Sequence, residues 1–149
     1  MWITLTVADI ATGLTGPELA AAQTAALRAA QTDPVLDVIA DVTREIRSRV
    51  AACSRNSLGG AGMIPDECKG HAVSLCVFRL AKRLPKAVLL DEDRRSANTQ
   101  AIAFLRDVGD CRVALEQPET ASEEVITQTP RPQWKARDRE FKRCQQDGI

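Results

Sequence analysis

The residues of this sequence that are best suited to chemistry gather between positions 53 and 76. This stretch contains three of the five cysteines, the single histidine, and the glycines Gly59, Gly60 and Gly62. Residues of these types could cradle a phosphate group, bind a metal ion or support nucleophilic catalysis. Each of these chemistries requires particular neighbours, and those neighbours can be checked in the sequence.

A phosphate-binding loop of the Walker type follows a strand and ends in Gly-Lys-Ser/Thr at the start of a helix. Here the glycines follow an amphipathic helical pattern, and Met63 stands where the lysine is required. A dinucleotide fingerprint also needs a preceding strand, and Pro65 occupies the place of its third glycine. We therefore expect no nucleotide and no other cofactor at this stretch.

Cys68, His71 and Cys76 are soft ligands at helical spacing, but zinc sites usually take four ligands in paired short spacings. We favour the alternative that both cysteines are small apolar core residues and that His71 borders the core. A Cys–His pair would also lack the third group and the oxyanion hole that catalysis needs. The acidic residues 91–93 lack the ligand spacing of a calcium loop. The sequence thus predicts no metal site, no catalytic residues and no enzyme.

The composition of the whole chain sets further limits. Twenty basic and twenty acidic residues cancel, so net charge alone does not attract nucleic acid or an anionic membrane. The five cysteines have irregular spacings, which do not indicate a disulfide framework, and we expect reduced thiols. No signal peptide is recognisable, and no apolar run approaches the roughly 20 residues that cross a bilayer.

Helix signals recur along the first half of the chain. Thr6 and Asp9 form a capping-box pattern that opens a short helix. Pro17 stands at the first position of an alanine-rich segment, where its missing N–H costs nothing. Asp33 and Pro34 repeat this arrangement before the strongest helical pattern of the sequence.

From Pro34 to Cys53, apolar residues recur at spacings of three and four, which predicts an amphipathic helix of about twenty residues. Pro65 opens a further helix, and the pattern from Ala97 predicts another that ends at Gly109. The short segment "CRVAL" then forms either a strand or an extended exit. The predicted fold class is all-α, a small bundle of about four helices that forms one domain over residues 1–116.

Residues 117–149 differ in composition. Their first half is rich in proline, threonine and glutamate and has few large apolar groups, so it cannot offset the entropy of ordering. From Arg131 to Arg143 there are six basic and two acidic residues, together with Trp134 and Phe141. Aromatic residues and arginine dominate binding hot spots, and we therefore expect an extended arm that becomes ordered on a partner.

The order of these segments has a likeness among known families. The segments are "TVADIATGLTG", "VLDVIADVTREIRSRV", "MIPDECKGHAVSLCVFRLAKRLP" and "AIAFLRDVGDCRVALEQPE". Together they resemble the head-tail connector proteins of tailed bacteriophages, also called adaptor or head-completion proteins. The likeness covers roughly residues 3–118, and Asp110-Cys111 after Gly109 departs from the family pattern.

The resemblance implies a structural virion protein without catalytic activity, at the capsid vertex and neck, that is assembled in the host cytoplasm. Such proteins form a homo-oligomeric ring, commonly of twelve copies, beneath the portal protein and present a surface to the next neck or tail-completion protein. DNA passes through the ring without sequence-specific contacts, which suits a net charge of zero because many phosphate contacts would hold the DNA in place.

The resemblance also suggests roles for two sets of residues. The carboxy-terminal arm is expected to dock on the portal through Arg131, Trp134, Lys135, Arg137, Arg139, Phe141, Lys142 and Arg143. The glycine stretch is interpreted as a flexible loop that projects from the bundle toward a neighbouring subunit or the neck. Its candidate contact residues are Arg55, Asn56, Leu58, Gly59, Gly60, Gly62 and Met63.

A second hypothesis belongs to a different class of protein. A small helical regulator with a basic carboxy-terminal arm would bind nucleic acid through that arm. It predicts an affinity for duplex DNA that falls steeply with salt and that is lost when Arg137, Arg139, Lys142 and Arg143 are replaced.

Overall fold

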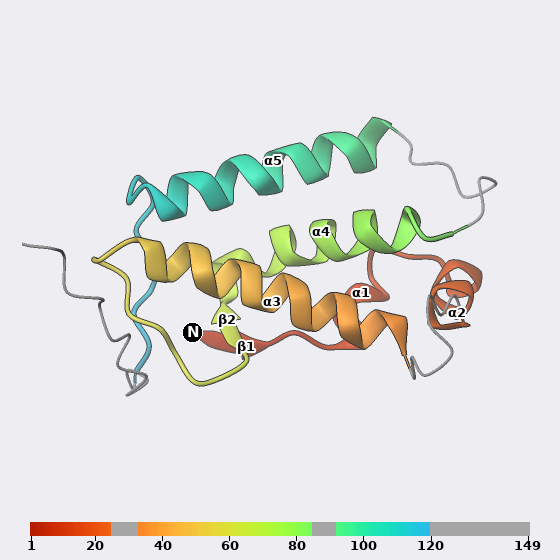
Figure 1. The fold of residues 1–149 in the computed structure, drawn as a ribbon, viewed down its shortest axis with the longest axis horizontal. Coiled ribbons are helices and arrows are strands. Elements are labelled where there is room, and N and C mark those ends of the chain that lie inside the picture. The colour runs from red at the N-terminus through yellow and green to blue at the C-terminus, as the bar shows by residue number, and fades with distance from the viewer. Residues whose placement is uncertain (25–32, 85–91, 120–149) are drawn as a thin grey trace, which may run out of the picture.

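A computed structural model describes residues 1–24, 33–84 and 92–119 of the chain (Figure 1). Within these residues the fold is mostly helical, which confirms the predicted class. Helices α3 (Pro34–Ala52), α4 (Lys69–Ala81) and α5 (Glu92–Gly109) contact one another in all three pairs. The shorter elements are β1 (Trp2–Thr4), α1 (Val7–Ile10), α2 (Gly16–Thr24), β2 (Met63–Pro65) and the 3-10 turn η1 (Asp66–Cys68).

The predicted amino-terminal helix signals are found in the structure. The Thr6 side chain accepts from the Asp9 N–H, and the Asp9 carboxylate accepts from the Thr6 N–H at 2.9 Å, which completes the capping box of α1. The Asp33 carboxylate accepts from the Val35 N–H at 2.8 Å, with Pro34 in the first turn of α3. These caps satisfy N–H groups that have no partner within the helix.

The core lies where α3, α4 and α5 meet. Val42, Ile46 and Val50 of α3 are fully buried, at the spacing of four that predicted one apolar face. From α4 and α5, Leu80 and Val108 are also fully buried. The first turn of α5 contains Glu92 and Asp93, where negative charge is favourable, and the apolar face predicted from Ala97 follows within the same helix.

A two-stranded sheet was not predicted. β1 pairs antiparallel with β2, with Ile3 opposite Ile64 in the register. Each strand has only three residues, too few for an alternating pattern to be recognised in the sequence. The segment "CRVAL" after α5, predicted as a strand or an extended exit, contains no regular element, although Leu115 is buried.

Ion pairs connect the short helices to the long ones. Arg94 of α5 holds Glu18 of α2 through two parallel contacts of 3.1 Å each, the bidentate geometry in which arginine binds carboxylates best. Lys69 at the start of α4 contacts Asp9 of α1 at 2.9 Å. No helix among the described residues is long and apolar enough to span a membrane.

Candidate functional site

The glycine stretch forms the loop between α3 and β2, and it is held against the rest of the domain. The Nη1 group of Arg47 donates to the carbonyl oxygens of Gly59 at 3.3 Å, Gly60 at 2.7 Å and Met63 at 2.9 Å. Arg47 lies on α3 and is half-buried. One side chain therefore satisfies three carbonyl groups in a segment that has few other backbone partners.

Two of the glycines occupy positions that disfavour a larger residue, one for lack of space and one for its backbone conformation. A Cβ atom on Gly59 would lie 2.5 Å from the indole ring of Trp2, so the ring packs directly on the bare backbone. Gly62 has a φ of 75°, in the left-handed region that favours glycine. The glycines thus allow close packing and a turn.

The exit segment, residues 110–119 after α5, runs beside this loop (Figure 1). The Gln117 side chain accepts from the Ser57 N–H at 2.9 Å and donates to the Arg55 carbonyl at 3.2 Å. The indole N–H of Trp2 donates to the Glu116 carbonyl at 3.2 Å. Glu116 also pairs with the amino group of Met1. The loop, the strand β1 and the exit segment therefore form one connected end of the domain.

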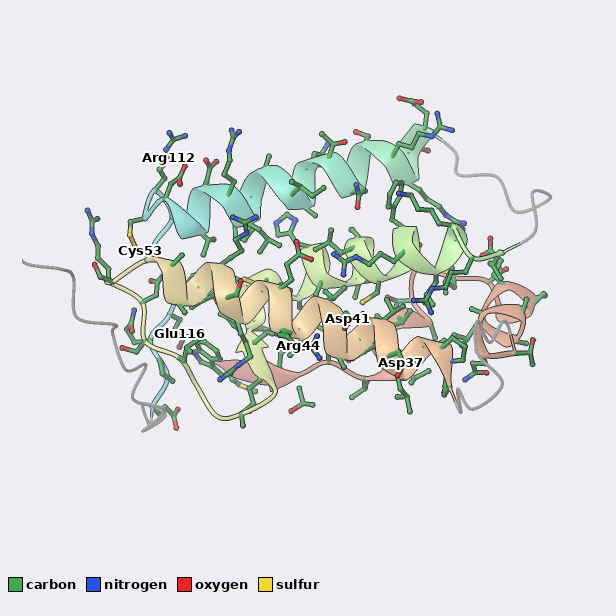
Figure 2. All side chains as sticks on the ribbon, in the orientation of Figure 1. Asp37, Asp41, Arg44, Cys53, Arg112 and Glu116 are labelled. Atoms are coloured by element: carbon green, nitrogen blue, oxygen red, sulfur yellow. A yellow bond between two sulfur atoms is a disulfide. The ribbon has the colours of Figure 1, made fainter. Side chains whose placement is uncertain are left out.

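A disulfide between Cys53 and Cys111 closes this end and corrects the expectation of reduced thiols. Cys53 ends α3 and Cys111 follows α5, so the two lie side by side although 58 residues separate them (Figure 2). Irregular cysteine spacing excluded a framework of several bridges, but it gave no information on a single bridge between helix ends. Cys111 has a φ of 61°, in the left-handed region that residues other than glycine seldom adopt.

A cavity of about 400 Å³ opens between the loop and the exit segment. Its walls come from Trp2, Gly59, Met63, Glu116 and Pro118, among others. Figure 2 shows Glu116 beside the loop, below the end of α3. The cavity lies where the described part of the chain ends at Glu119, within the first residues of the predicted arm (117–149).

The predicted loop residues therefore have unequal surroundings. Leu58 is half-buried and packs against the core, and Asn56 is half-buried with its Nδ2 group unpartnered among the described residues. Arg55 and Gly60 are exposed. The prediction of a flexible, projecting loop is therefore corrected. Arg47 and Gln117 form hydrogen bonds with the loop, and Trp2 packs on it. Neither Arg47 nor Trp2 had a sequence signal for this role, since both depend on contacts far along the chain.

Cys68 and Cys76 are free and buried, as predicted for core residues. Burial raises the pKa of each thiol to about 12, which leaves both protonated and unreactive at neutral pH. His71 borders the core and stacks on Phe104 of α5 with ring centroids 4.1 Å apart. Its pKa is lowered by burial. Among the described residues no three cysteine, histidine or acidic side chains come together as a metal site would require.

The predicted docking arm, Arg131 to Arg143, lies outside the described residues. Of the predicted arm, the structure describes only residues 117–119. Its binding role therefore stays a prediction.

The comparisons with known proteins agree with a phage origin. The family whose sequence pattern matches the chain is described as bacteriophage Mu, Gp36, and the match covers residues 5–131. This chain belongs to the bacteriophage Mu Gp36 family and is a phage protein. Curated proteins and solved structures give no significant match. The match extends past the described helical domain into the predicted arm.

Proposed function

We propose that this chain is a structural virion protein that serves as a head-tail connector. Copies of it would form a ring beneath the portal, extend the DNA channel and link the capsid to the neck or tail, without catalysing a reaction. The observation that carries the proposal is membership of a phage protein family over residues 5–131, in a chain whose described part is a small helical domain.

The anchoring of the exit segment supports a docking role for the arm. Gln117 is hydrogen-bonded to the loop, and the disulfide at Cys111 lies just before it. A docked arm would therefore be attached to an end of the domain that a disulfide and hydrogen bonds hold together. Aromatic and basic residues of the arm, such as Trp134 and Arg137, have the chemistry of binding hot spots.

The primary test is a nonsense mutation in the gene for this chain, in the phage that encodes it. We expect DNA-filled heads and separate tails to accumulate, as seen by electron microscopy, because the head can be packed but not joined. Supplying the intact gene in trans should restore tailed particles. Infectious tailed particles without the protein would contradict the proposal.

The second test addresses the portal. Purified portal rings are sedimented with the full chain or with a chain that ends at Glu119. We expect the full chain to co-sediment and the shortened chain to remain in the supernatant. Equal binding of the two chains would contradict the docking-arm role while leaving the ring and neck functions to the first test.

A further inference from the structure

An apolar groove runs along one side of α3. It lies between this helix and the end of β1, and it has a volume of about 350 Å³. Leu36, which is 54% exposed, forms one wall. A single exposed aliphatic residue needs no explanation, but this one borders a space that accepts branched aliphatic side chains. The other residues that line the groove are Thr4, Leu5, Ile39, Ala40, Thr43, Arg44, Arg47 and Gly62.

The two charged residues that line the groove, Arg44 and Arg47, are both cations. Arg44 contacts Asp41 at 3.0 Å (Figure 2), and both side chains are largely exposed. Such a surface pair contributes little to stability, so a second carboxylate can approach Arg44 at little cost. Asp41 itself lies about 140° around the helix axis from Leu36 and does not line the groove. The groove therefore favours a segment that carries both carboxylates and apolar side chains.

The two ends of the groove differ in chemistry. Arg44 and Arg47 lie toward the carboxy-terminal end of α3, whereas Leu36 and Ile39 lie toward its amino-terminal end. Leu36 and Arg47 are about 16 Å apart along the helix axis. The cationic end adjoins the glycine loop, because Arg47 donates to the Gly60 carbonyl at 2.7 Å. With distance from the loop, the groove therefore changes from cationic to apolar.

The described part of the chain ends beside the cationic end of the groove. Glu119 lines the cavity that Gly60 and Trp2 also line. Gly60 is held by Arg47, and Trp2 stands two residues before Thr4 in β1. Two residues of a strand span about 7 Å, and Thr4 already lines the groove. The chain that follows Glu119 therefore starts within a few residues' length of the groove.

One segment of the carboxy-terminal arm has a matching composition. Between residues 120 and 149, acidic residues adjoin large aliphatic residues only in Glu123-Glu124-Val125-Ile126. Val125 follows Glu119 by six residues, which span up to about 20 Å of extended chain. The acidic pair comes first and the aliphatic pair second, which is the order of the cationic and apolar walls with distance from the loop. The family match, over residues 5–131, includes this segment.

We propose that residues 123–126 bind in this groove of their own chain. The two glutamates lie against Arg44 and Arg47, and the two aliphatic side chains cover Leu36. The rest of the arm, from Thr127 on, then starts at the amino-terminal end of α3 and not at the glycine loop. The contact goes beyond the connector role and does not rest on it, because it joins two parts of one chain.

Cross-linking of the folded chain tests this contact. A contact of four residues opens more easily than the helical core, so urea releases it before the core unfolds and the midpoint of unfolding does not report on it. The full-length chain carries Ala40→Cys in the groove, Thr127→Cys beside the docked segment, and Cys144→Ser. Ala40 is exposed and cysteine is only slightly larger, so the apolar walls of the groove are kept.

Dilute protein is treated with a short bismaleimide, which the buried thiols Cys68 and Cys76 do not reach. We expect a monomeric product in which mass spectrometry finds the peptides of positions 40 and 127 joined. A product that joins two copies in place of the monomeric product would overturn the proposal, because it would place the segment in the groove of a neighbouring copy.

Ser48→Cys in place of Ala40→Cys provides the matched control. Ser48 is exposed on α3, outside the groove, and about 12 Å from Ala40 along the helix axis. An arm that is tethered but not docked would reach both positions. We expect the Ala40 variant to form the monomeric product about tenfold faster, because docking raises the local concentration of Thr127→Cys. Equal rates would overturn the proposal.

A charge exchange tests the polar part of the contact. Glu123→Lys with Glu124→Lys should lower the rate of cross-linking about fivefold, because it places like charges beside Arg44. Arg44→Glu, added to this variant, should restore most of the rate. Arg47 is left unchanged because it also holds the glycine loop. Failure of the restoration would overturn the proposed pairing.

Asp138→Lys with Glu140→Lys is the control for net charge. It makes the same change of charge further along the arm, and we expect it to leave the rate of cross-linking unchanged. A fall as large as that of the Glu123 and Glu124 variant would overturn the proposal, because the effect would then come from the charge of the whole arm. If tailed particles form without the protein, the connector role fails, and these rates still decide the contact.

Discussion

At the scale of single residues, the anchored loop depends on contacts that replace regular structure. The carbonyl groups of Gly59, Gly60 and Met63 converge on one nitrogen of Arg47. Hydrogen bonds to a charged donor contribute about 1.5–3 kcal/mol each when both partners are held in place. The loop is therefore fixed by side chains on α3 and β1.

Gly59 provides a sharp test of this packing. In Gly59→Ala the new methyl group would meet the Trp2 ring at 2.5 Å, and overpacking of this kind costs about 1–3 kcal/mol. We expect the free energy of unfolding in urea to fall by that amount. Gly70→Ala is the control, because nothing lies within 4 Å of its Cβ position and alanine favours a helix by up to about 1 kcal/mol. Equal stability of the two variants would show that the loop does not pack on Trp2.

The pair of Glu18 and Arg94 predicts a dependence of stability on pH. The Arg94 guanidinium, followed by the Thr15 N–H, lowers the pKa of Glu18 from 4.5 to about 2. A lowered pKa in the folded state stabilises the protein above the unfolded pKa, and this stabilisation is lost as the pH falls through the folded value. We expect the free energy of unfolding to decline between about pH 5 and pH 2.

Replacing either partner should reduce that decline. Glu18→Gln removes the titrating group, and Arg94→Gln removes the main cause of its lowered pKa. Urea unfolding at several pH values compares both variants with the unchanged chain. A decline of undiminished size in both would assign the pH dependence to other carboxyl groups, such as Asp9, whose pKa is lowered to about 2 chiefly by Lys69.

At the scale of elements, the long helices are joined at one end by a covalent bond. The Cys53–Cys111 disulfide links the end of α3 to the segment after α5 across 58 residues of chain. A bond that closes a long loop restricts the unfolded chain, and native disulfides contribute about 2–5 kcal/mol. The disulfide therefore stabilises the packing of the three helices at the end where the exit segment begins.

Reduction should weaken the domain by about 2–5 kcal/mol, measured by urea unfolding with and without a phosphine reductant. The double variant Cys53→Ser/Cys111→Ser should show the same loss without reductant and no further loss with it. Mass spectrometry of alkylated, unreduced protein should detect the Cys53–Cys111 peptide pair. An effect of the reductant that persists in the double variant would assign that effect to another cause.

At the scale of the whole molecule, the described core lies within the first part of the chain. The buried apolar residues run from Leu5 to Leu115, and a segment with few apolar groups adds little to a packed core. We expect a chain that ends at Glu119 to keep the helical circular dichroism and the urea midpoint of the full chain. This measurement is also the control for the portal experiment, because lost binding is then not due to unfolding. A markedly lower midpoint would show that residues after 119 belong to the folded domain.

The main helices could be predicted from the sequence because their signals are local. The capping pair Thr6 and Asp9, the Asp33-Pro34 start and the spacing of Val42, Ile46 and Val50 all act within a few turns of one helix. The core character of Cys68 and Cys76 was predicted because a free cysteine behaves as a small apolar side chain. Local hydrogen bonding and periodic burial favour such elements independently of contacts that are distant in the sequence.

The candidate site was decided by tertiary structure. Its contacts join residues about 57 to 62 positions apart in the sequence. They are the Cys53–Cys111 disulfide, the packing of Trp2 on Gly59 and the hydrogen bonds of Gln117 with the loop. No periodicity within one segment encodes contacts at that separation. The sequence by itself determined a capped helical bundle. Only the tertiary structure, by bringing three chain segments to one end, determined that its glycine loop is anchored.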